Sequence, residues 1–327
     1  MTDKIRWGII GPGNIAKRFA GGLAVLDDAT LQAVASRSQE KADAFADEFG
    51  APTRYTSYQD LVADDDIDII YIATVNPFHA EQMLLCLEAG KPVLCEKPFT
   101  INTAEAKKVV QVAREKKLFL MEGMWTRHFP LMHKLRQILA DGVIGEVRML
   151  NADFGFSGQV NPTSRLYDLN LGGGGMLDVG IYPLSLASMI FGKPEKLSSF
   201  ADIGETGVDE LSVLMMQYPA GEVAVVYSAI RASMPHDSMI MGRKGRIRIH
   251  SPWWMPTKMT ITVNGKDDEV VEMPMEGTGF NYQIAEAGRC LREGKLESDV
   301  MPLDETISIM EMMDEARTQW GLKYPME

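Results

Sequence analysis

The sequence predicts a two-domain α/β protein. The first domain is a Rossmann fold with a doubly wound parallel sheet, and the second is an α+β domain with an open, mostly antiparallel sheet flanked by helices. Three observations predict this fold class. A glycine-rich turn at residues 11–13 joins an apolar run to a helical stretch, short apolar runs alternate with helical periods up to residue 121, and longer strand-like segments follow residue 141.

Strands and helices alternate in the N-terminal half of the chain. The predicted strands cover residues 5–10, 31–35, 67–73, 93–95 and 118–121, and the predicted helices cover residues 15–25, 38–49, 77–90 and 102–117. Strands that alternate with helices of this length are typical of βαβ units and a parallel sheet. We therefore predict a dinucleotide-binding domain over residues 1–122.

The C-terminal half is rich in strands. They are predicted at residues 147–156, 211–218, 223–229, 245–250, 259–263 and 270–273, and a last helix is predicted at about residues 304–320. The connections at residues 219–221, 242–245 and 264–265 have the composition of tight turns, so consecutive strands should pair as antiparallel neighbours. We assign residues 123–327 to a substrate-binding and dimerisation domain.

The composition disfavours several classes of partner. The chain has 45 acidic and 33 basic residues and a net charge of -12, whereas nucleic acids and anionic membranes need a basic face. We expect neither a signal peptide nor an apolar run of membrane-spanning length. Three widely spaced cysteines and five histidines without an H-x-x-x-H pair predict neither disulfides nor a metal site. A cytoplasmic protein with a small-molecule substrate fits best.

The glycine turn has the order of residues that a dinucleotide-binding turn requires. Gly11 allows the tight turn, Gly13 lets the backbone approach a pyrophosphate, and Ala16 allows close packing of helix and strand. Asn14 and Ile15 open the helix whose N-terminus would hold the pyrophosphate.

The end of the second predicted strand indicates which cofactor is bound. A carboxylate there would select NAD, but the sequence places Ser36, Arg37 and Ser38 at this point. Because Arg37 can bind a phosphate and the two serines offer hydroxyl groups, NADP(H) is preferred and NAD(H) is the second choice. The alternative is that Ser38 is only a helix N-cap and Arg37 a solvated surface charge.

Two later strand ends should line the nicotinamide. Thr74, Asn76 and His79 follow the fourth strand, although His79 fits equally well as an ordinary residue at the start of a helix. Glu96 and Lys97 end the next strand. Lys97 is either a surface residue or a positioned cation, and we favour a cation that stabilises charge developing on a substrate oxygen during hydride transfer.

A glycine-rich segment carries the second group of candidates. Asp178 and Tyr182 follow the four glycines at residues 172–175, and on a helix they would share one face. Pro183 would kink such a helix. The alternative interpretation gives Asp178 a capping role and places Tyr182 in the core.

These motifs together resemble the Gfo/Idh/MocA family, the glucose-fructose oxidoreductase and inositol dehydrogenase group of NAD(P)-dependent oxidoreductases, over nearly the whole chain. The resemblance rests on residues 11–16, residues 96–98 and the segment with Asp178 and Tyr182. Many members have histidine at the position of Tyr182. Tyrosine is similar to the branch that contains dimeric dihydrodiol dehydrogenase and NADP-dependent D-xylose dehydrogenases.

The resemblance also implies roles for single residues. Lys97 would be the electrostatic and proton-handling group, Tyr182 the proton donor or acceptor, and Asp178 their orienting partner. Trp125 and Arg127 would lie near the nicotinamide. Many members pair their subunits through the open face of the second sheet, so a homodimer or higher oligomer is expected.

The substrate pocket is the least specific prediction. Trp125, Phe154 and Trp254 are candidate walls for a cyclic diol or a sugar ring, although large aromatic residues are more often part of the core. Arg165 is either a gate or a surface residue. We expect an NADP-dependent dehydrogenase of a secondary carbinol, with an NAD-dependent glycosidase and a non-catalytic cofactor sensor as the alternatives.

Overall fold

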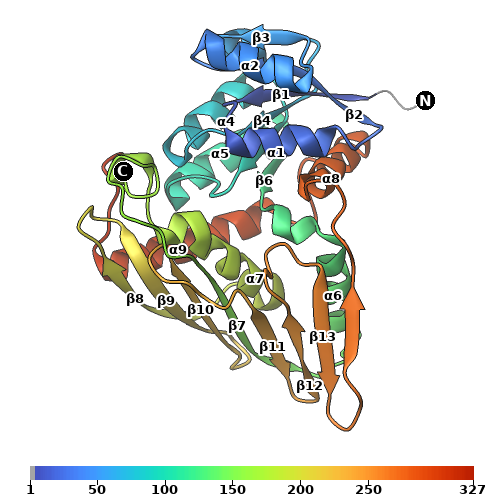
Figure 1. The fold of residues 1–327 in the computed structure, drawn as a ribbon, viewed down its shortest axis with the longest axis vertical. Coiled ribbons are helices and arrows are strands. Elements are labelled where there is room, and N and C mark those ends of the chain that lie inside the picture. Colours follow the sequence, from blue (N-terminus) through green and yellow to red (C-terminus); the bar gives the residue numbers. More distant parts are fainter. Residues whose placement is uncertain (1–3) are drawn as a thin grey trace. The chain divides into compact units, whose positions relative to one another are not determined.

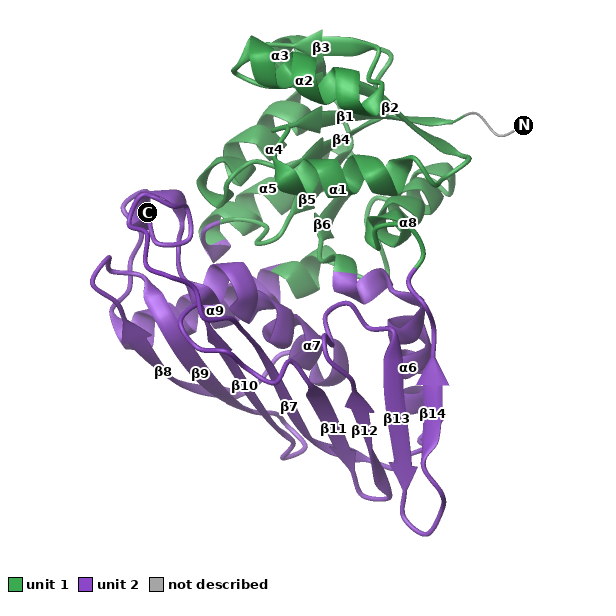
Figure 2. Cartoon of the chain, viewed as in Figure 1, with its two compact units in different colours: residues 1–100, 104–125, 276–306 green, residues 101–103, 126–275, 307–327 purple. Residues whose placement is uncertain are grey.

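The computed structural model describes residues 4–327 and divides into two compact units (Figure 2). Unit 1 comprises residues 1–100, 104–125 and 276–306, and unit 2 comprises residues 101–103, 126–275 and 307–327. The chain enters the long segment of unit 2 at residue 126, near the predicted boundary. It then returns to unit 1 at residue 276, which the prediction of a continuous second domain over residues 123–327 did not include.

Helix packing explains this return. Helix α8 (Phe280–Arg292) lies against helix α1 (Asn14–Leu23) so closely that a Cβ atom on Gly22 would lie 2.9 Å from the backbone nitrogen of Asn281. The Arg18 guanidinium also lies 5.3 Å from the ring centroid of Phe280. Segment 276–306 therefore belongs to the unit whose helix it covers.

Unit 1 contains the predicted parallel sheet, with six strands in the order β3-β2-β1-β4-β5-β6 (Figure 1). The chain order reverses between β1 and β4, and such switch points are where open α/β sheets bind ligands. The short elements β3 and α3 were not predicted. The strands are β1 Ile5–Ile10, β2 Ala29–Ala35, β3 Thr53–Tyr55, β4 Ile69–Ile72, β5 Val93–Glu96 and β6 Leu120–Gly123, and the further helices are α2 Gln39–Phe49, α3 Tyr58–Val62, α4 His79–Glu88 and α5 Thr103–Lys116.

Unit 2 contains a mixed sheet of eight strands in the order β14-β13-β12-β11-β7-β10-β9-β8. Only β7 and β10 pair in parallel, so the prediction of a mostly antiparallel sheet is confirmed. The strands are β7 Val147–Gly155, β8 Lys196–Ile203, β9 Asp209–Gln217, β10 Val223–Ala229, β11 Ser238–Gly242, β12 Gly245–Ile249, β13 Lys258–Val263 and β14 Glu269–Glu272, with helices α6 Pro130–Ala140, α7 Ile181–Phe191 and α9 Leu303–Trp320.

The sequence analysis did not predict β8, β11, α6 or α8. Strand β8 buries Leu197 and Ser199 and exposes the alternate residues Ser198 and Phe200, so its pattern does not stand out as an apolar run. Strand β11 is only five residues long.

One stretch of unit 2, residues 169–191, is long and apolar enough by length and composition to cross a membrane. The prediction that no apolar run reaches this length was therefore wrong. Its most apolar window is 78% buried inside the protein, which is typical of a core helix.

Candidate active site

The glycine turn after β1 has the geometry that a pyrophosphate needs. Gly11 has φ +87°, and a Cβ atom there would lie 2.7 Å from Thr74 Cγ2. A Cβ atom on Gly13 would meet nothing within 4 Å. Gly13 precedes α1, which begins with Asn14 and Ile15, and no side chain caps that N-terminus. The helix start thus has no side-chain cap and has open space at the Gly13 Cβ position, two features that suit phosphate binding.

The end of β2 carries the residues predicted to select the cofactor. Ser38 caps α2 by accepting a hydrogen bond from the Lys41 amide at 3.3 Å, and the Ser36 hydroxyl accepts one from the Ser38 amide at 3.2 Å. Ser38 is therefore the N-cap of α2, as the alternative interpretation of the sequence expected. Arg37 is exposed, and its guanidinium lies 5.6 Å from the ring centroid of Phe78. The Arg37 side chain is therefore accessible to an anionic group at the end of this strand.

His79 joins the ends of β4 and β5. It is fully buried, with Nδ1 2.8 Å from the carbonyl oxygen of Pro98 and Nε2 3.1 Å from that of Thr74. Burial lowers the pKa of His79. The Thr74 hydroxyl donates to Gln82, and Asn76 starts a short 3-10 turn just before α4. His79 thus begins α4 and links two loops through its ring nitrogens, which agrees with the interpretation of His79 as an ordinary residue at the start of a helix.

Glu96 is a buried carboxyl group at the end of β5. Burial raises its pKa to about 7, although Tyr71 opposes this shift by donating a hydrogen bond from Oη to Oε1 at 2.5 Å. The Tyr71 ring stacks on Phe19 of α1. Lys97 follows directly and is half-buried. Lys97 therefore leaves the sheet edge beside a carboxyl group that is held in place by the core.

Trp125 and Arg127 have clear packing partners. The Trp125 ring stacks on Phe280 at a centroid distance of 4.9 Å, and the Arg18 guanidinium lies 5.0 Å from the Trp125 ring. In unit 2, the buried Arg127 guanidinium donates to the hydroxyl and carbonyl oxygens of Ser185 in α7, at 2.8 and 2.6 Å. The observed contacts of Arg127 are thus structural, and its predicted approach to the nicotinamide stays a prediction.

Asp178 and Tyr182 lie at the start of the long helix of unit 2. One π-helical turn, Met176–Gly180, lies directly before α7, and Pro183 is the third residue of α7. Asp178 lies in this turn and Tyr182 is the second residue of α7. The Arg165 guanidinium pairs with Asp178 Oδ1 at 2.9 Å, so Arg165 contacts a predicted site residue rather than being only a surface side chain.

Tyr182 belongs to a group of aromatic residues in unit 2. The rings of Phe154 and Trp254 stack at a centroid distance of 3.5 Å and an angle of 8°. Tyr182 lies 5.2 Å from Phe154, and His236 lies 4.6 Å from Trp254. The two predicted walls of the substrate pocket in this unit therefore lie together and beside the phenol.

Each unit thus brings together part of the predicted site. In unit 1, Gly11 and Thr74 are in direct contact, and His79 joins Thr74 to the segment that carries Lys97. Sequence reasoning did not find Tyr71, Phe280 or His236, because each is recognisable only from its long-range partner. Within residues 4–327, no cluster of histidine, cysteine, aspartate or glutamate is arranged to hold a metal ion.

Two family profiles match the chain. The profile of an oxidoreductase family with an NAD-binding Rossmann fold matches residues 5–124, and that of the GFO/IDH/MocA C-terminal domain matches residues 132–248. The chain is 40% identical over 335 aligned residues to the trans-1,2-dihydrobenzene-1,2-diol dehydrogenase of Mus musculus, with 99% of both chains covered. Its identity to the enzyme of that name from Homo sapiens is 37%, also with 99% coverage of both.

Solved structures agree with this assignment. The 3-ketoreductase from Actinomadura kijaniata, in complex with NADP and TDP-benzene, has a TM-score of 0.87 and 26% identity, covering 97% of this chain and 98% of that one. An aldose-aldose oxidoreductase from Caulobacter crescentus has the same fold, with a TM-score of 0.89 at 22% identity and the same coverage. The resemblance inferred from the motifs is confirmed, and the chain belongs to the GFO/IDH/MocA family of NAD(P)-dependent oxidoreductases.

Proposed function

We propose that this protein is an NADP-dependent dehydrogenase that oxidises a secondary carbinol of a trans-dihydrodiol or a cyclic sugar, or reduces the corresponding carbonyl. The observation that carries the proposal is the position of Tyr182 beside the stacked rings of Phe154 and Trp254. Flat aromatic faces suit a cyclic diol, and the phenol beside them can exchange a proton with its hydroxyl group. The dihydrodiol dehydrogenases that resemble the chain over their full length support the same substrate class.

The chemistry follows from three side chains. The glycine turn and Arg37 would hold NADP, which would supply the hydride acceptor for the carbinol carbon. In its phenolate form Tyr182 accepts the hydroxyl proton and becomes the phenol, and Lys97 stabilises the negative charge that develops on the substrate oxygen. Asp178 orients Tyr182 from the preceding turn. In the reductive direction, Tyr182 returns the proton to the carbonyl oxygen.

The choice of NADP rests on Arg37. Its exposed guanidinium follows β2, where no carboxylate is present to repel a 2′-phosphate. Arg37→Ala should raise KM for NADP by about 10-fold or more and leave KM for NAD nearly unchanged. Equal increases for both cofactors would contradict this assignment.

The substrate class can be tested directly. A panel of aldoses, inositols, 1,5-anhydroketoses and dihydrodiols should be assayed by NADPH absorbance with NADP(H) and NAD(H) in parallel. The proposal expects turnover of a dihydrodiol or a cyclic sugar with NADP. Turnover of no member of the panel would contradict it, and glycoside cleavage without net NADPH formation would indicate the glycosidase alternative.

We also propose that two copies pair through the open face of the unit 2 sheet. On β9, Leu214 and Met216 are buried while Met215 is 44% exposed, and Phe200 of β8 is 71% exposed. Val213 lies between Phe200 and Tyr227 on that face. A row of apolar side chains across neighbouring strands is typical of a surface that a partner covers, and the resemblance favours a second copy.

The oligomeric state provides the test. Phe200→Asp should weaken self-association by about 10-fold or more, because it places a charge in the row of exposed apolar side chains on β8 and β9. Val25→Asp is the control, since Val25 is 55% exposed but lies outside the sheet. Light scattering after gel filtration should show a dimer for the parent and the control. A monomeric parent would contradict the proposal.

The three cysteines, Cys86, Cys95 and Cys290, are buried free thiols. We therefore keep the cytoplasm, a reducing compartment, as the proposed location.

A further inference from the structure

We propose that Asp209, assisted by Tyr324, is a positioning residue that holds the turn carrying Asp178 and Tyr182. The inference rests on the proposed function, because it assigns the task of placing the proton-transfer pair. Neither residue lies in a motif that the sequence analysis singled out. Both act from segments far along the chain from the glycines at residues 172–175.

Asp209 replaces a missing helix cap. The π-helical turn begins after Gly175, which has no side chain to cap the free amides of a helix start. Asp209, the first residue of β9, is fully buried, and its Oδ2 accepts a hydrogen bond from the Met176 amide at 2.6 Å. A carboxyl group at a helix N-terminus satisfies these amides and interacts favourably with the helix dipole. Asp209 therefore supplies from another strand what the local sequence lacks.

The glycines make room for this carboxyl group. Gly174 has φ +116°, and a Cβ atom there would lie 2.3 Å from Asp209 Oδ1. A Cβ atom on Gly175 would lie 3.3 Å from Asp209 Oδ2. Any larger residue at position 174 would thus collide with the carboxyl group as well as strain the backbone. This contact explains why glycine is needed at that point of the cluster.

Two further contacts hold the same turn. The buried Tyr324 hydroxyl donates to the Gly173 carbonyl oxygen at 2.8 Å, and the Gly174 amide donates to the Leu166 carbonyl oxygen at 2.9 Å. Asp209 lies on a strand, Tyr324 in the C-terminal segment and Leu166 in the loop before the glycines. The turn is therefore held by three segments that are distant from one another in sequence.

The position of the turn matters for the chemistry. Met176, whose amide donates a hydrogen bond to Asp209, is the first residue of the turn that contains Asp178. Tyr182 follows within the next helical turn. The Asp178 amide contacts the Gly174 carbonyl oxygen at 3.4 Å. A displacement of about 1 Å in a reacting group can lower the rate by about 100-fold. Loss of the Asp209 contact should therefore lower kcat without removing the cofactor site.

An oxygen acceptor at residue 209 is sufficient to hold the Met176 amide, whether or not it carries a charge. Burial raises the pKa of Asp209 to about 7, so the carboxyl group is partly protonated near neutral pH, and Oδ2 can accept from Met176 in either form. The Arg317 guanidinium and the Tyr324 phenol are the other titratable groups near it. Asp209→Asn keeps an acceptor of nearly the same shape, whereas Asp209→Ala removes it.

The test compares Asp209→Ala, Asp209→Asn and Tyr324→Phe with Asp267→Ala, which removes an exposed carboxylate from the turn between β13 and β14 and serves as the control. We expect Asp209→Ala to lower kcat by about 10-fold or more, with NADPH affinity changed by less than about 2-fold. Asp209→Asn should recover kcat to within about 3-fold of the parent, and Tyr324→Phe should lower kcat by about 3-fold. Asp267→Ala should match the parent.

Hydrogen exchange provides a second measurement that does not depend on activity. The amides of residues 174–182 should exchange faster in Asp209→Ala and at nearly the parental rate in Asp209→Asn. Unchanged exchange and unchanged kcat in a folded Asp209→Ala variant would overturn the inference, as would an Asn variant as impaired as the Ala variant. If Asp209→Ala does not fold, an unaltered kcat and exchange rate in Tyr324→Phe overturn it. A parent without turnover contradicts the proposed function instead, and the exchange measurement then still tests the inference.

Discussion

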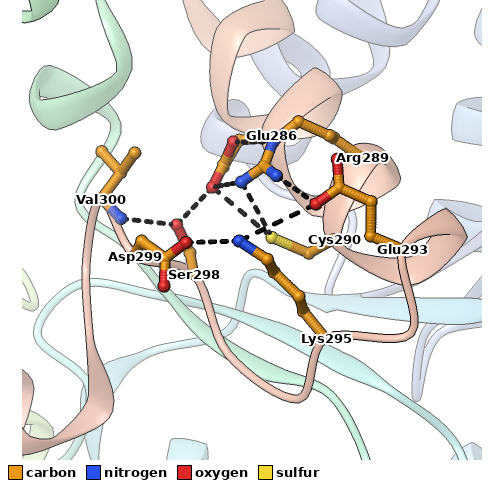
Figure 3. A network of polar contacts seen from close by, with 8 residues as sticks. All are labelled: Glu286, Arg289, Cys290, Glu293, Lys295, Ser298, Asp299 and Val300. Atoms are coloured by element: carbon orange, nitrogen blue, oxygen red, sulfur yellow. Dashed lines mark hydrogen bonds and ion pairs between the residues drawn. The ribbon is translucent and has the colours of Figure 1, made fainter.

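Glu286 of α8 allows a quantitative test of how unit 1 is held together. Its carboxylate accepts hydrogen bonds from Arg289 at 2.9 and 3.0 Å, from the Ser298 hydroxyl at 2.5 Å and from the Cys290 thiol at 3.5 Å (Figure 3). Burial by itself raises the pKa of Glu286, but the hydrogen bonds from Arg289 and Ser298 outweigh it and lower the pKa to about 2. The network ties the end of α8 to the segment that follows it.

The shift in pKa gives the size of the effect. The difference between the ordinary value of 4.5 and a pKa of about 2 corresponds to about 3 kcal/mol of unfolding free energy. The Glu286 side chain is 12% exposed, so solvent screens little of this contribution to the unfolding free energy. Because the pKa is lowered on folding, the stabilisation is fully present above about pH 5 and falls to less than half by about pH 3.

Urea unfolding of the parent and Glu286→Gln checks the prediction. The unfolding free energy of the variant should be about 2 to 3 kcal/mol lower than that of the parent at neutral pH. This difference should shrink as the pH falls from about 5 to about 3. Glu293→Gln is the matched control. Glu293 accepts a hydrogen bond from the same Arg289, but its side chain is 46% exposed, so its replacement should lower the unfolding free energy by less than about 1 kcal/mol. Equal losses for the two variants, or a loss for Glu286→Gln that is independent of pH, would refute the reasoning.

Three further predictions concern the cofactor half of the site. Gly13→Leu should leave the thermal unfolding midpoint nearly unchanged, since a Cβ atom there meets nothing within 4 Å, but should weaken NADPH binding by about 10-fold or more in a fluorescence titration. Gly11→Ala should instead destabilise the fold by about 1 to 3 kcal/mol, because φ is +87° and the methyl group meets Thr74; an unchanged midpoint would contradict this. Tyr71→Phe removes the hydrogen bond to Glu96 and should cost about 1 to 3 kcal/mol. Because burial already raises the pKa of Glu96 to about 7, that loss should grow as the pH rises above 7, and a loss that shrinks instead would count against the argument.

The part of the fold that the sequence predicts well is the part that local patterns specify. The turn at Gly11 and Gly13 has no alternative to glycine at its first position, and the apolar strands of unit 1 are short runs between helices. Local sequence also places the start of α2, because Ser38 is its N-cap, and the end of the apolar strand β5 at Glu96. These residues therefore appear in the structure where the patterns place them.

The remaining features depend on residues that are distant in the chain. No local signal connects Asp209 to Gly174, and only the folded sheet brings the two together. The return of α8 to unit 1 depends on the packing of its first turn against Gly22 of α1. Strand β8 alternates exposed and buried residues with Phe200 on the open face, so its composition is less apolar than that of a core strand.

The central proposal is that Lys97 and Tyr182 take part in the same chemical step, in which Lys97 stabilises charge and Tyr182 transfers the proton. The most direct test is single-turnover oxidation of trans-dihydrobenzenediol by the parent, Lys97→Met, Tyr182→Phe and the double variant, with NADPH affinity measured alongside. Each single variant should lower the rate by about 100-fold or more while NADPH still binds, and the double variant should be little worse than either one. Activity retained in both single variants, or losses that multiply in the double variant, would contradict the account.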